Sequence, residues 1–132
     1  MKELRVLILI GIHLSPLPSS IKCLTKLKML CFDQCKLGKD LSIIGELEKL
    51  RVLSLSGTDI EHLPVELRKL AKLQIFDISN CFQLHTFPAN VLSSLTSLEE
   101  LYVGNSPIQW KDEAGQGNQI GNASLSELMH LN

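Results

Sequence analysis

Large apolar residues recur at fixed positions in five segments of this chain, and this periodicity restricts the possible folds more than any other feature of the sequence. Leucine accounts for 26 of the 132 residues, whereas Trp and Tyr occur once each. A core built largely from one residue type at a fixed period indicates stacked structural units. The segments share the template LxxLxLxx(N/C)xL, lie 23 to 25 residues apart, and begin at Leu4, Leu27, Leu50, Leu73 and Leu98.

This template and its period are those of the leucine-rich repeat, which predicts an α/β solenoid of about five repeats, shaped as an arc or horseshoe. Each segment should form a short strand whose fourth and sixth positions point inward and whose third, fifth and seventh positions point outward. The strands should form a parallel sheet on the concave face, opposite short helical or 3-10 turns on the convex face. The expected inward pairs are Leu7 and Leu9, Leu30 and Phe32, Leu53 and Leu55, Phe76 and Ile78, and Leu101 and Val103.

The second half of each copy supports the prediction of short helical or 3-10 turns on the convex face. LPSSIKCL from Leu17, LPVELRKL from Leu63 and FPANVLSSL from Phe87 each place a proline before apolar residues at helical spacing. The second copy reads LGKDLSIIGEL without proline, which predicts a looser turn. A polar, Gly- and Asn-containing stretch predicts a surface loop over 109–124. We interpret 1–132 as a single leucine-rich-repeat domain and as a fragment, because neither end carries an amphipathic capping segment.

The ninth template position is a predicted structural position. In this fold its side chain turns inward as the strand ends and can bond to backbone groups of the bend that would otherwise be unpaired. Small polar side chains suit this role, and the cysteine spacing matches neither a zinc site nor a disulfide framework, so we expect reduced thiols. The residues at this position in the second to fifth copies are Cys35, Thr58, Cys81 and Ser106.

The outward positions of the strands form the candidate binding surface. Tyr102, Asp77 and Asp33 are the strongest candidates for partner contacts, because a lone aromatic side chain beside polar groups is typical of binding hot spots. The apolar residues of the third-position row could equally be strand formers that pack on their neighbours. The candidate partner-binding residues on the concave face are Ile8, Ile10, Met29, Cys31, Asp33, Ser54, Ser56, Asp77, Ser79, Glu100 and Tyr102.

Charge and motifs narrow the classes of partner and activity. The chain has 13 basic and 14 acidic side chains with interspersed signs, which argues against a polyphosphate, nucleic acid included, or an anionic membrane as partner. No apolar run approaches the ~20 residues of a membrane span. The sequence contains no phosphate-binding loop motif, and its four histidines occur singly without a triad or metal-site pattern. We therefore predict that the chain is not an enzyme and holds no cofactor or metal.

The sequence resembles the leucine-rich-repeat region of plant intracellular immune receptors, the nucleotide-binding leucine-rich-repeat (NB-LRR) disease resistance proteins, and among them the coiled-coil class. The resemblance rests on LRVLSLSGTDIEHLPVELRKLAKLQIFDISNC at 50–81, SLTSLEELYVGNSPIQWKDE at 94–113 and NASLSEL at 122–128. It implies a cytoplasmic protein-interaction module that senses pathogen effectors or modified host proteins and holds a nucleotide-binding switch domain at rest. The ADP/ATP site of that family lies in the switch domain, which has no matching residues here.

Two other interpretations remain open at this stage. A generic cytosolic scaffold would use the same concave wall to assemble signalling proteins, without any attached nucleotide switch. An extracellular receptor ectodomain is the other alternative, but such proteins usually have 24-residue copies that read GxIP at the bend, whereas this chain has LP without the glycine. The sequence therefore favours a protein-binding function inside the cell, with a pathogen effector, a host protein or the chain's own nucleotide-binding domain as partner.

Overall fold

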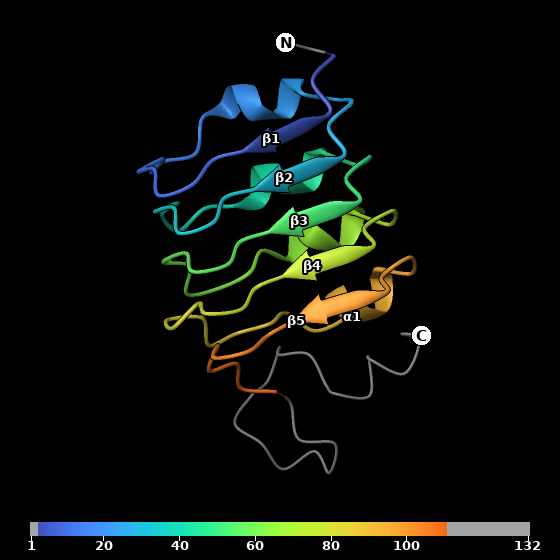
Figure 1. The fold of residues 1–132 in the computed structure, drawn as a ribbon. Helices are drawn as coiled ribbons and strands as arrows, with labels where there is room; N and C mark the ends of the chain where they lie inside the picture. Colours follow the sequence, from blue (N-terminus) through green and yellow to red (C-terminus); the bar gives the residue numbers. More distant parts are fainter. Residues whose placement is uncertain (1–2, 111–132) are drawn as a thin grey trace.

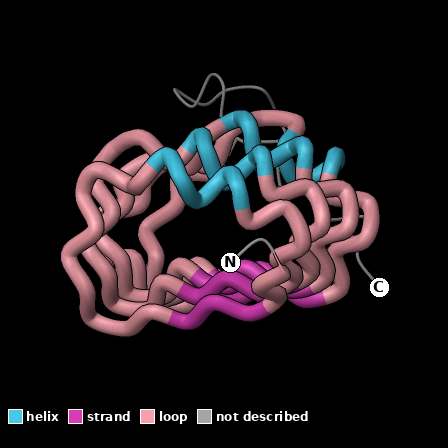
Figure 2. The backbone as a smooth tube through the Cα atoms, turned by 90° about the horizontal axis from the view of Figure 1, so that it is seen from above, coloured by secondary structure: helices cyan, strands magenta, loops and turns pink. Residues whose placement is uncertain are grey.

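A computed structural model of the 132-residue chain describes residues 3–110, which form a stack of repeated turns of chain around one apolar interior. One wall is a five-stranded parallel sheet in which the strands follow sequence order, and the opposite wall consists of short helical turns (Figures 1 and 2). The predicted leucine-rich-repeat solenoid is thereby confirmed in architecture. The strands are β1 (Val6–Ile8), β2 (Met29–Cys31), β3 (Val52–Ser54), β4 (Ile75–Asp77) and β5 (Glu100–Tyr102).

The register of the sheet aligns equivalent template positions of all five repeats. Leu30 pairs with Leu7 on one side and with Leu53 on the other, and the same step continues to Phe76 and Leu101. Because side chains alternate along a strand, each template position becomes a row that runs across the sheet on one face only. The sequence period therefore determines which residues become neighbours in space.

The inward rows make the core, as the template predicts. Leu30, Phe32, Leu53 and Leu55 are fully buried, whereas Leu7 of the first repeat is only half-buried. Each interior repeat is covered by a neighbour on both sides, and burial of one such side chain contributes roughly 1.5–3 kcal/mol. The remaining inward residues follow the same division: Phe76 and Ile78 are buried, and Leu9, Leu101 and Val103 are partly buried.

The opposite wall contains one turn from each of the first four repeats. They are the 3-10 turns η1 (Ser19–Cys23), η2 (Ser42–Glu46) and η3 (Val65–Lys69), and the single α-helical turn α1 (Val91–Ser94). Pro18 and Pro64 precede η1 and η3 in extended conformation, consistent with a residue that fixes φ and donates no hydrogen bond.

The expectation of a looser turn in the second repeat is wrong. η2 has the same length as η1 and η3, and its start is stabilised by Asp40, whose Oδ1 accepts hydrogen bonds from the Ser42 backbone N–H at 3.0 Å and hydroxyl at 2.7 Å. These two bonds hold the pKa of Asp40 below its usual value. Packing against η3 is close: a Cβ added at Gly45 would lie 2.6 Å from the carbonyl oxygen of Glu66. An Asp–Ser turn thus replaces the proline.

The last described residues extend the core beyond β5. Trp110 is partly buried and stacks on Phe87 with ring centroids 5.4 Å apart, and Phe87 in turn meets Phe76 edge to face at 6.3 Å. Of the loop predicted over 109–124, only Gln109 and Trp110 belong to the described residues. Gln109 is exposed and donates its backbone N–H to the carbonyl of His85 at 2.9 Å, and Trp110 packs against the core. Within residues 3–110, no helix has the length and apolar composition needed to cross a membrane.

The eighth template position adopts left-handed backbone in every repeat, a feature that the sequence template did not predict. In the first four repeats its N–H donates to the carbonyl of the seventh residue of the next repeat, as from Gly57 to Ser79 at 3.0 Å. The positive φ directs this N–H along the stack, and residues without a Cβ or with a short amide tolerate it best. The residues are Gly11, Gln34, Gly57, Asn80 and Asn105, with φ between 57° and 70°.

Gly57→Ala should destabilise the fold by about 1–2 kcal/mol, because a Cβ is disfavoured at its φ of +70° and would lie 3.2 Å from Cγ of Gln34. Gly104→Ala is the control, since nothing lies within 4 Å of its Cβ and its φ is not left-handed. Chemical denaturation followed by circular dichroism measures both. Equal midpoints for the two variants would contradict the role of the eighth position.

Candidate functional site

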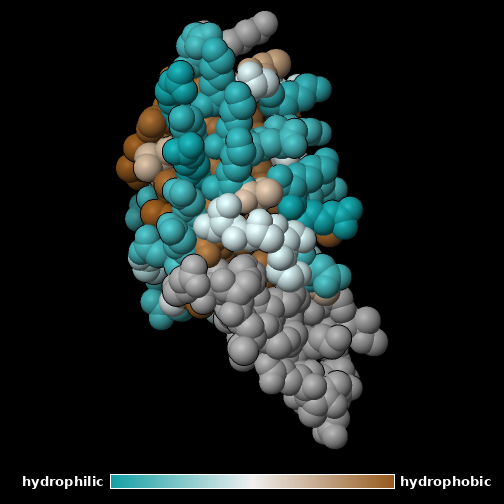
Figure 3. Space-filling model, turned by 90° about the vertical axis from the view of Figure 1, so that its right-hand side faces the viewer, coloured by the Kyte–Doolittle hydropathy of each residue, from teal (hydrophilic) through white to brown (hydrophobic). Residues whose placement is uncertain are grey.

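The outer face of the sheet, formed by the third, fifth and seventh template positions, is the candidate binding surface and is called the sheet face below. Its three rows cross all five strands and the residues directly after them. At the N-terminal end the face is apolar and exposed: Val6 exposes 50%, Ile8 52% and Ile10 62% of its surface. Hydrophobic residues gather accordingly at the left edge of the space-filling view, which is the sheet side of the molecule (Figure 3).

The centre of the sheet face is a network of polar side chains that bond to one another. The Ser54 hydroxyl donates to Oδ1 of Asp33, and Ser54 exposes only 9% of its surface. Asp77 accepts from the Ser79 backbone N–H at 2.9 Å and from the Ser79 hydroxyl at 2.6 Å, and the Ser79 and Ser56 hydroxyls lie 3.2 Å apart. Because these bonds fix the carboxylates in place, Asp33 and Asp77 are oriented hydrogen-bond acceptors on the sheet face.

The C-terminal end of the sheet face carries its aromatic residue. Tyr102 is exposed by 48%, and its hydroxyl donates to Oε1 of Glu100 on the same face. This hydrogen bond, together with the charge of Glu100, raises the pKa of the Tyr102 hydroxyl. A tyrosine phenol is protonated at neutral pH, and this one offers a flat apolar ring with one polar tip, which suits a contact residue.

Cys31 lies between the apolar and polar parts of the sheet face. Its thiol is partly buried, and burial, followed by the negative charges of Asp33 and then Asp77, raises its pKa. A raised pKa keeps the thiol protonated and weakly nucleophilic. The arrangement therefore makes Cys31 a packing and contact residue and gives it no activation as a nucleophile.

The ninth-position side chains lie below the sheet face and bond to the backbone of the bends. The Cys81 thiol donates to the carbonyl oxygen of Leu55 at 3.0 Å, and the Thr58 hydroxyl donates to the same oxygen at 2.7 Å. The Cys35 thiol donates to the carbonyl of Leu9 at 3.3 Å. Ser106 accepts from the Cys81 backbone N–H at 3.0 Å. The thiols of Cys35 and Cys81 therefore satisfy carbonyls of the preceding repeat, and the Thr58 hydroxyl satisfies a carbonyl of its own repeat.

The structure brings the eleven candidate partner-binding residues onto one continuous face, but their accessibility differs. Ile8, Ile10, Glu100 and Tyr102 are exposed, whereas Met29, Cys31, Asp33, Ser56, Asp77 and Ser79 are half-buried and Ser54 is nearly covered. Val6 belongs to the same face and is half exposed, although sequence reasoning did not select it. The alternation along β1, which places Val6 and Ile8 outward and Leu7 inward, is the signal that identifies it.

Residues 3–110 contain no group of three or more His, Cys, Asp or Glu side chains arranged to hold a metal ion. In the same range all four cysteines are free thiols.

Comparison with known proteins identifies the fold through solved structures. No protein-family model and no curated protein matches the chain. A structure described as a TDR receptor superposes with a TM-score of 0.72 at 23% identity, over 93% of this chain and 22% of that one. The chain has the leucine-rich-repeat solenoid fold.

Two further solved structures agree with this assignment. A leucine-rich-repeat protein of Leptospira interrogans superposes with a TM-score of 0.66 at 22% identity, over 98% of this chain and 35% of that one. The Arabidopsis receptor kinase HAESA, in complex with the peptide hormone IDA and the co-receptor SERK1, superposes with a TM-score of 0.71 at 24% identity, over 89% of this chain and 20% of that one. The chain thus spans about a fifth to a third of the length of these proteins.

Asp33→Asn should accelerate alkylation of Cys31 by iodoacetamide at pH 8 several-fold, because loss of the negative charge lowers the pKa of the thiol and raises its thiolate fraction. The asparagine retains an oxygen that can accept the Ser54 hydroxyl. Peptide mass spectrometry measures the rate at Cys31, with the exposed Cys23 as internal reference. Glu61→Gln, in an exposed bend, is the matched control and should leave the rate unchanged; an equal acceleration there would contradict the assigned electrostatics.

Proposed function

We propose that this chain is a protein-binding segment of a plant intracellular immune receptor of the coiled-coil NB-LRR class, and that the sheet face is its contact surface. The observation that carries the binding function is the sheet face itself, which combines exposed apolar residues at one end, oriented carboxylates at the centre and Tyr102 at the other end. Binding hot spots combine these properties: an aromatic anchor, apolar area and polar groups already held in position.

The intracellular immune class is supported by the sequence. The stretch LYVGNSPIQW and the loop that follows it resemble that receptor family, whereas the 23-residue copies with LP at the bend are shared with animal cytosolic scaffold repeats. The buried thiols of Cys35 and Cys81 act as hydrogen-bond donors in the bends, which requires them to be reduced and suits the cytoplasm. In this proposal the partner is a pathogen effector, a host protein or the receptor's own nucleotide-binding domain, and the chain supplies neither a catalytic group nor a cofactor.

A second candidate is a peptide-binding receptor ectodomain. It is favoured by the solved structures, because HAESA is described in complex with a peptide hormone and another matching structure is the plant peptide hormone receptor RGFR1 with RGF2. The sheet face could accept an extended peptide along its rows. The LP bends and the reduced thiols favour the intracellular candidate over this one.

The test begins with the coding sequence upstream of Met1. An in-frame phosphate-binding loop followed by a switch domain would support the receptor class, and a signal peptide followed by further repeats would support the ectodomain. The encoded neighbouring domain, produced as a separate polypeptide, then serves as the binding partner in a calorimetric titration with the 132-residue chain.

Tyr102→Ala combined with Asp77→Ala should weaken that binding by about tenfold or more, the effect of losing at least about 1.4 kcal/mol at a hot spot. The control combines Phe82→Ala with Glu61→Ala, which removes one aromatic and one acidic side chain from exposed bends away from the sheet face. Circular dichroism checks that both variants fold. Equal affinities for the two variants would exclude the sheet face as the contact surface.

A further inference from the structure

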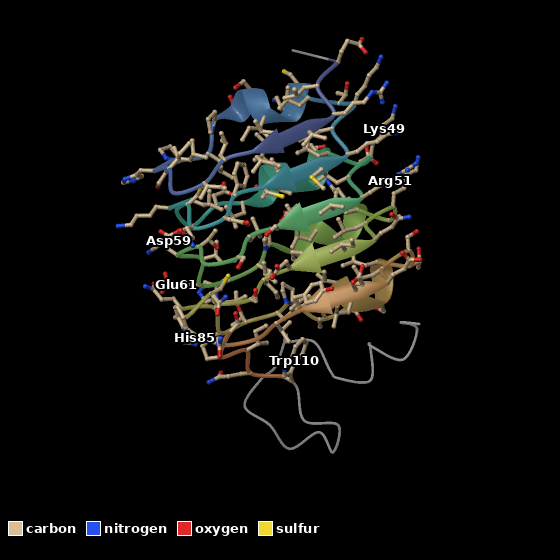
Figure 4. All side chains as sticks on the ribbon, in the orientation of Figure 1. Lys49, Arg51, Asp59, Glu61, His85 and Trp110 are labelled. Carbon is tan, nitrogen blue, oxygen red and sulfur yellow. The ribbon has the colours of Figure 1, made fainter. Side chains whose placement is uncertain are left out.

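Six cationic side chains surround one hollow on the edge of the molecule where the strands begin. The hollow has a volume of about 280 Å³. We call it the basic hollow, and its lining residues are Arg5, Lys26, Lys28, Lys49, Arg51 and Lys72. Lys49 and Arg51 extend from this edge, on the opposite side of the sheet from the bends that carry Asp59 and Glu61 (Figure 4). The same edge is strongly hydrophilic in the space-filling view (Figure 3).

The repeat itself produces this arrangement. Arg5, Lys28 and Arg51 directly follow the first leucine of the first three repeats, and a second column of lysines directly precedes that leucine in the second to fourth repeats. Adjacent parallel strands lie about 4.8 Å apart, so each column stacks three like charges at this interval. The columns end in the fourth and fifth repeats, where Gln74 and Glu99 follow the leucine.

The backbone beneath the first column is fixed by hydrogen bonds between repeats. The Arg5 carbonyl accepts from the N–H groups of Lys28 at 2.8 Å and Met29 at 3.0 Å, and the Lys28 carbonyl accepts from Arg51 at 2.8 Å. The cationic side chains therefore project from backbone segments that these hydrogen bonds hold together. Among residues 3–110, one ion pair reaches this group, between Lys26 and the exposed Glu3 at 2.8 Å. The other five cations of the hollow have no ion pair within the described part of the chain.

We propose that the basic hollow is a binding site for a compact soluble polyphosphate, a small molecule that carries several phosphate groups close together. Charge density decides between ligand classes. Three adjacent repeats span about 10 Å along the stack. An extended acidic peptide places side chains on one face only every 6.6 to 6.8 Å, so it offers about two carboxylates over that distance. A polyphosphate offers more negative charge in the same space, and arginine and lysine are the side chains that bind phosphate.

This site is separate from the sheet face and does not depend on the proposed protein-binding function. The basic and acidic residues are interspersed along the sequence, and this spacing hides the clustering of cations that the fold creates. The net charge of −1 is an average over the chain, whereas the fold gathers six of the 13 cations at one hollow. Local potential, and not net charge, determines whether a small anion is attracted.

Calorimetric titration of the 132-residue chain with inorganic tripolyphosphate at 0.15 M NaCl tests the proposal. Lys49→Gln combined with Arg51→Gln should weaken binding by at least about tenfold and reduce its dependence on salt, because two cations leave the site. Lys36→Gln combined with Lys39→Gln removes the same charge from exposed positions beyond the opposite ends of the strands and should change affinity by less than about twofold. Should the first variant fail to fold, Arg5→Gln with Lys72→Gln carries the same expectation.

Three results would overturn the proposal. The first is an equal loss of affinity in the basic-hollow and control variants, which would reduce the effect to net charge. The second is a hexaglutamate peptide that binds as tightly as tripolyphosphate, which would assign the hollow to an acidic protein segment. The third is tighter binding to a single-stranded oligonucleotide or to phosphatidylcholine vesicles with phosphatidylinositol bisphosphate, which would assign it to nucleic acid or to a lipid head group.

Discussion

The stacking of each repeat on its neighbours is the interaction on which the rest of this structure depends. A single repeat of 23 residues cannot bury its own leucines, and Leu30 or Leu53 is covered only because strands and turns on both sides close over it. The first repeat shows the converse, since Leu7 and Leu9 remain partly exposed at the end of the stack. Stability is therefore a property of pairs of repeats, and the interior repeats hold most of it.

The same stacking converts sequence period into surface pattern. Because the register is exact from β1 to β5, every outward template position becomes a row of five residues about 4.8 Å apart. The fifth-position row changes from Ile8 through Cys31, Ser54 and Asp77 to Tyr102, so one row contains an apolar end, a polar centre and an aromatic end. The solenoid itself stays constant while its rows vary, which is how a repeat fold acquires a specific surface.

Much of the fold and of the sheet face could be predicted from the sequence, because leucines at positions one, four and six of each repeat are all buried when the repeats stack. The inward pairs, the parallel sheet and the outward rows all follow from side-chain alternation. The regular turn in the second repeat could not be predicted from proline alone, since Asp40 and Ser42 supply the turn by side-chain bonds. Nor could the near burial of Ser54, which bonds to Asp33 of the preceding repeat, or the left-handed Gln34, which bonds to Ser56 of the next repeat.

The two candidate surfaces differ in how their charges are balanced, and this difference has a physical consequence. On the sheet face, Asp33 and Asp77 accept hydrogen bonds from serines, so their charges are partly satisfied before any partner binds. At the basic hollow, stacked cations of neighbouring repeats repel one another, in opposition to the hydrogen bonds that hold β1 to β4 together. A polyanion bound there would replace this repulsion with attraction between neighbouring repeats and would add stability through its binding free energy. The inter-repeat stacking and the occupancy of the hollow would then reinforce each other, since a ligand that bridges columns favours only the folded stack.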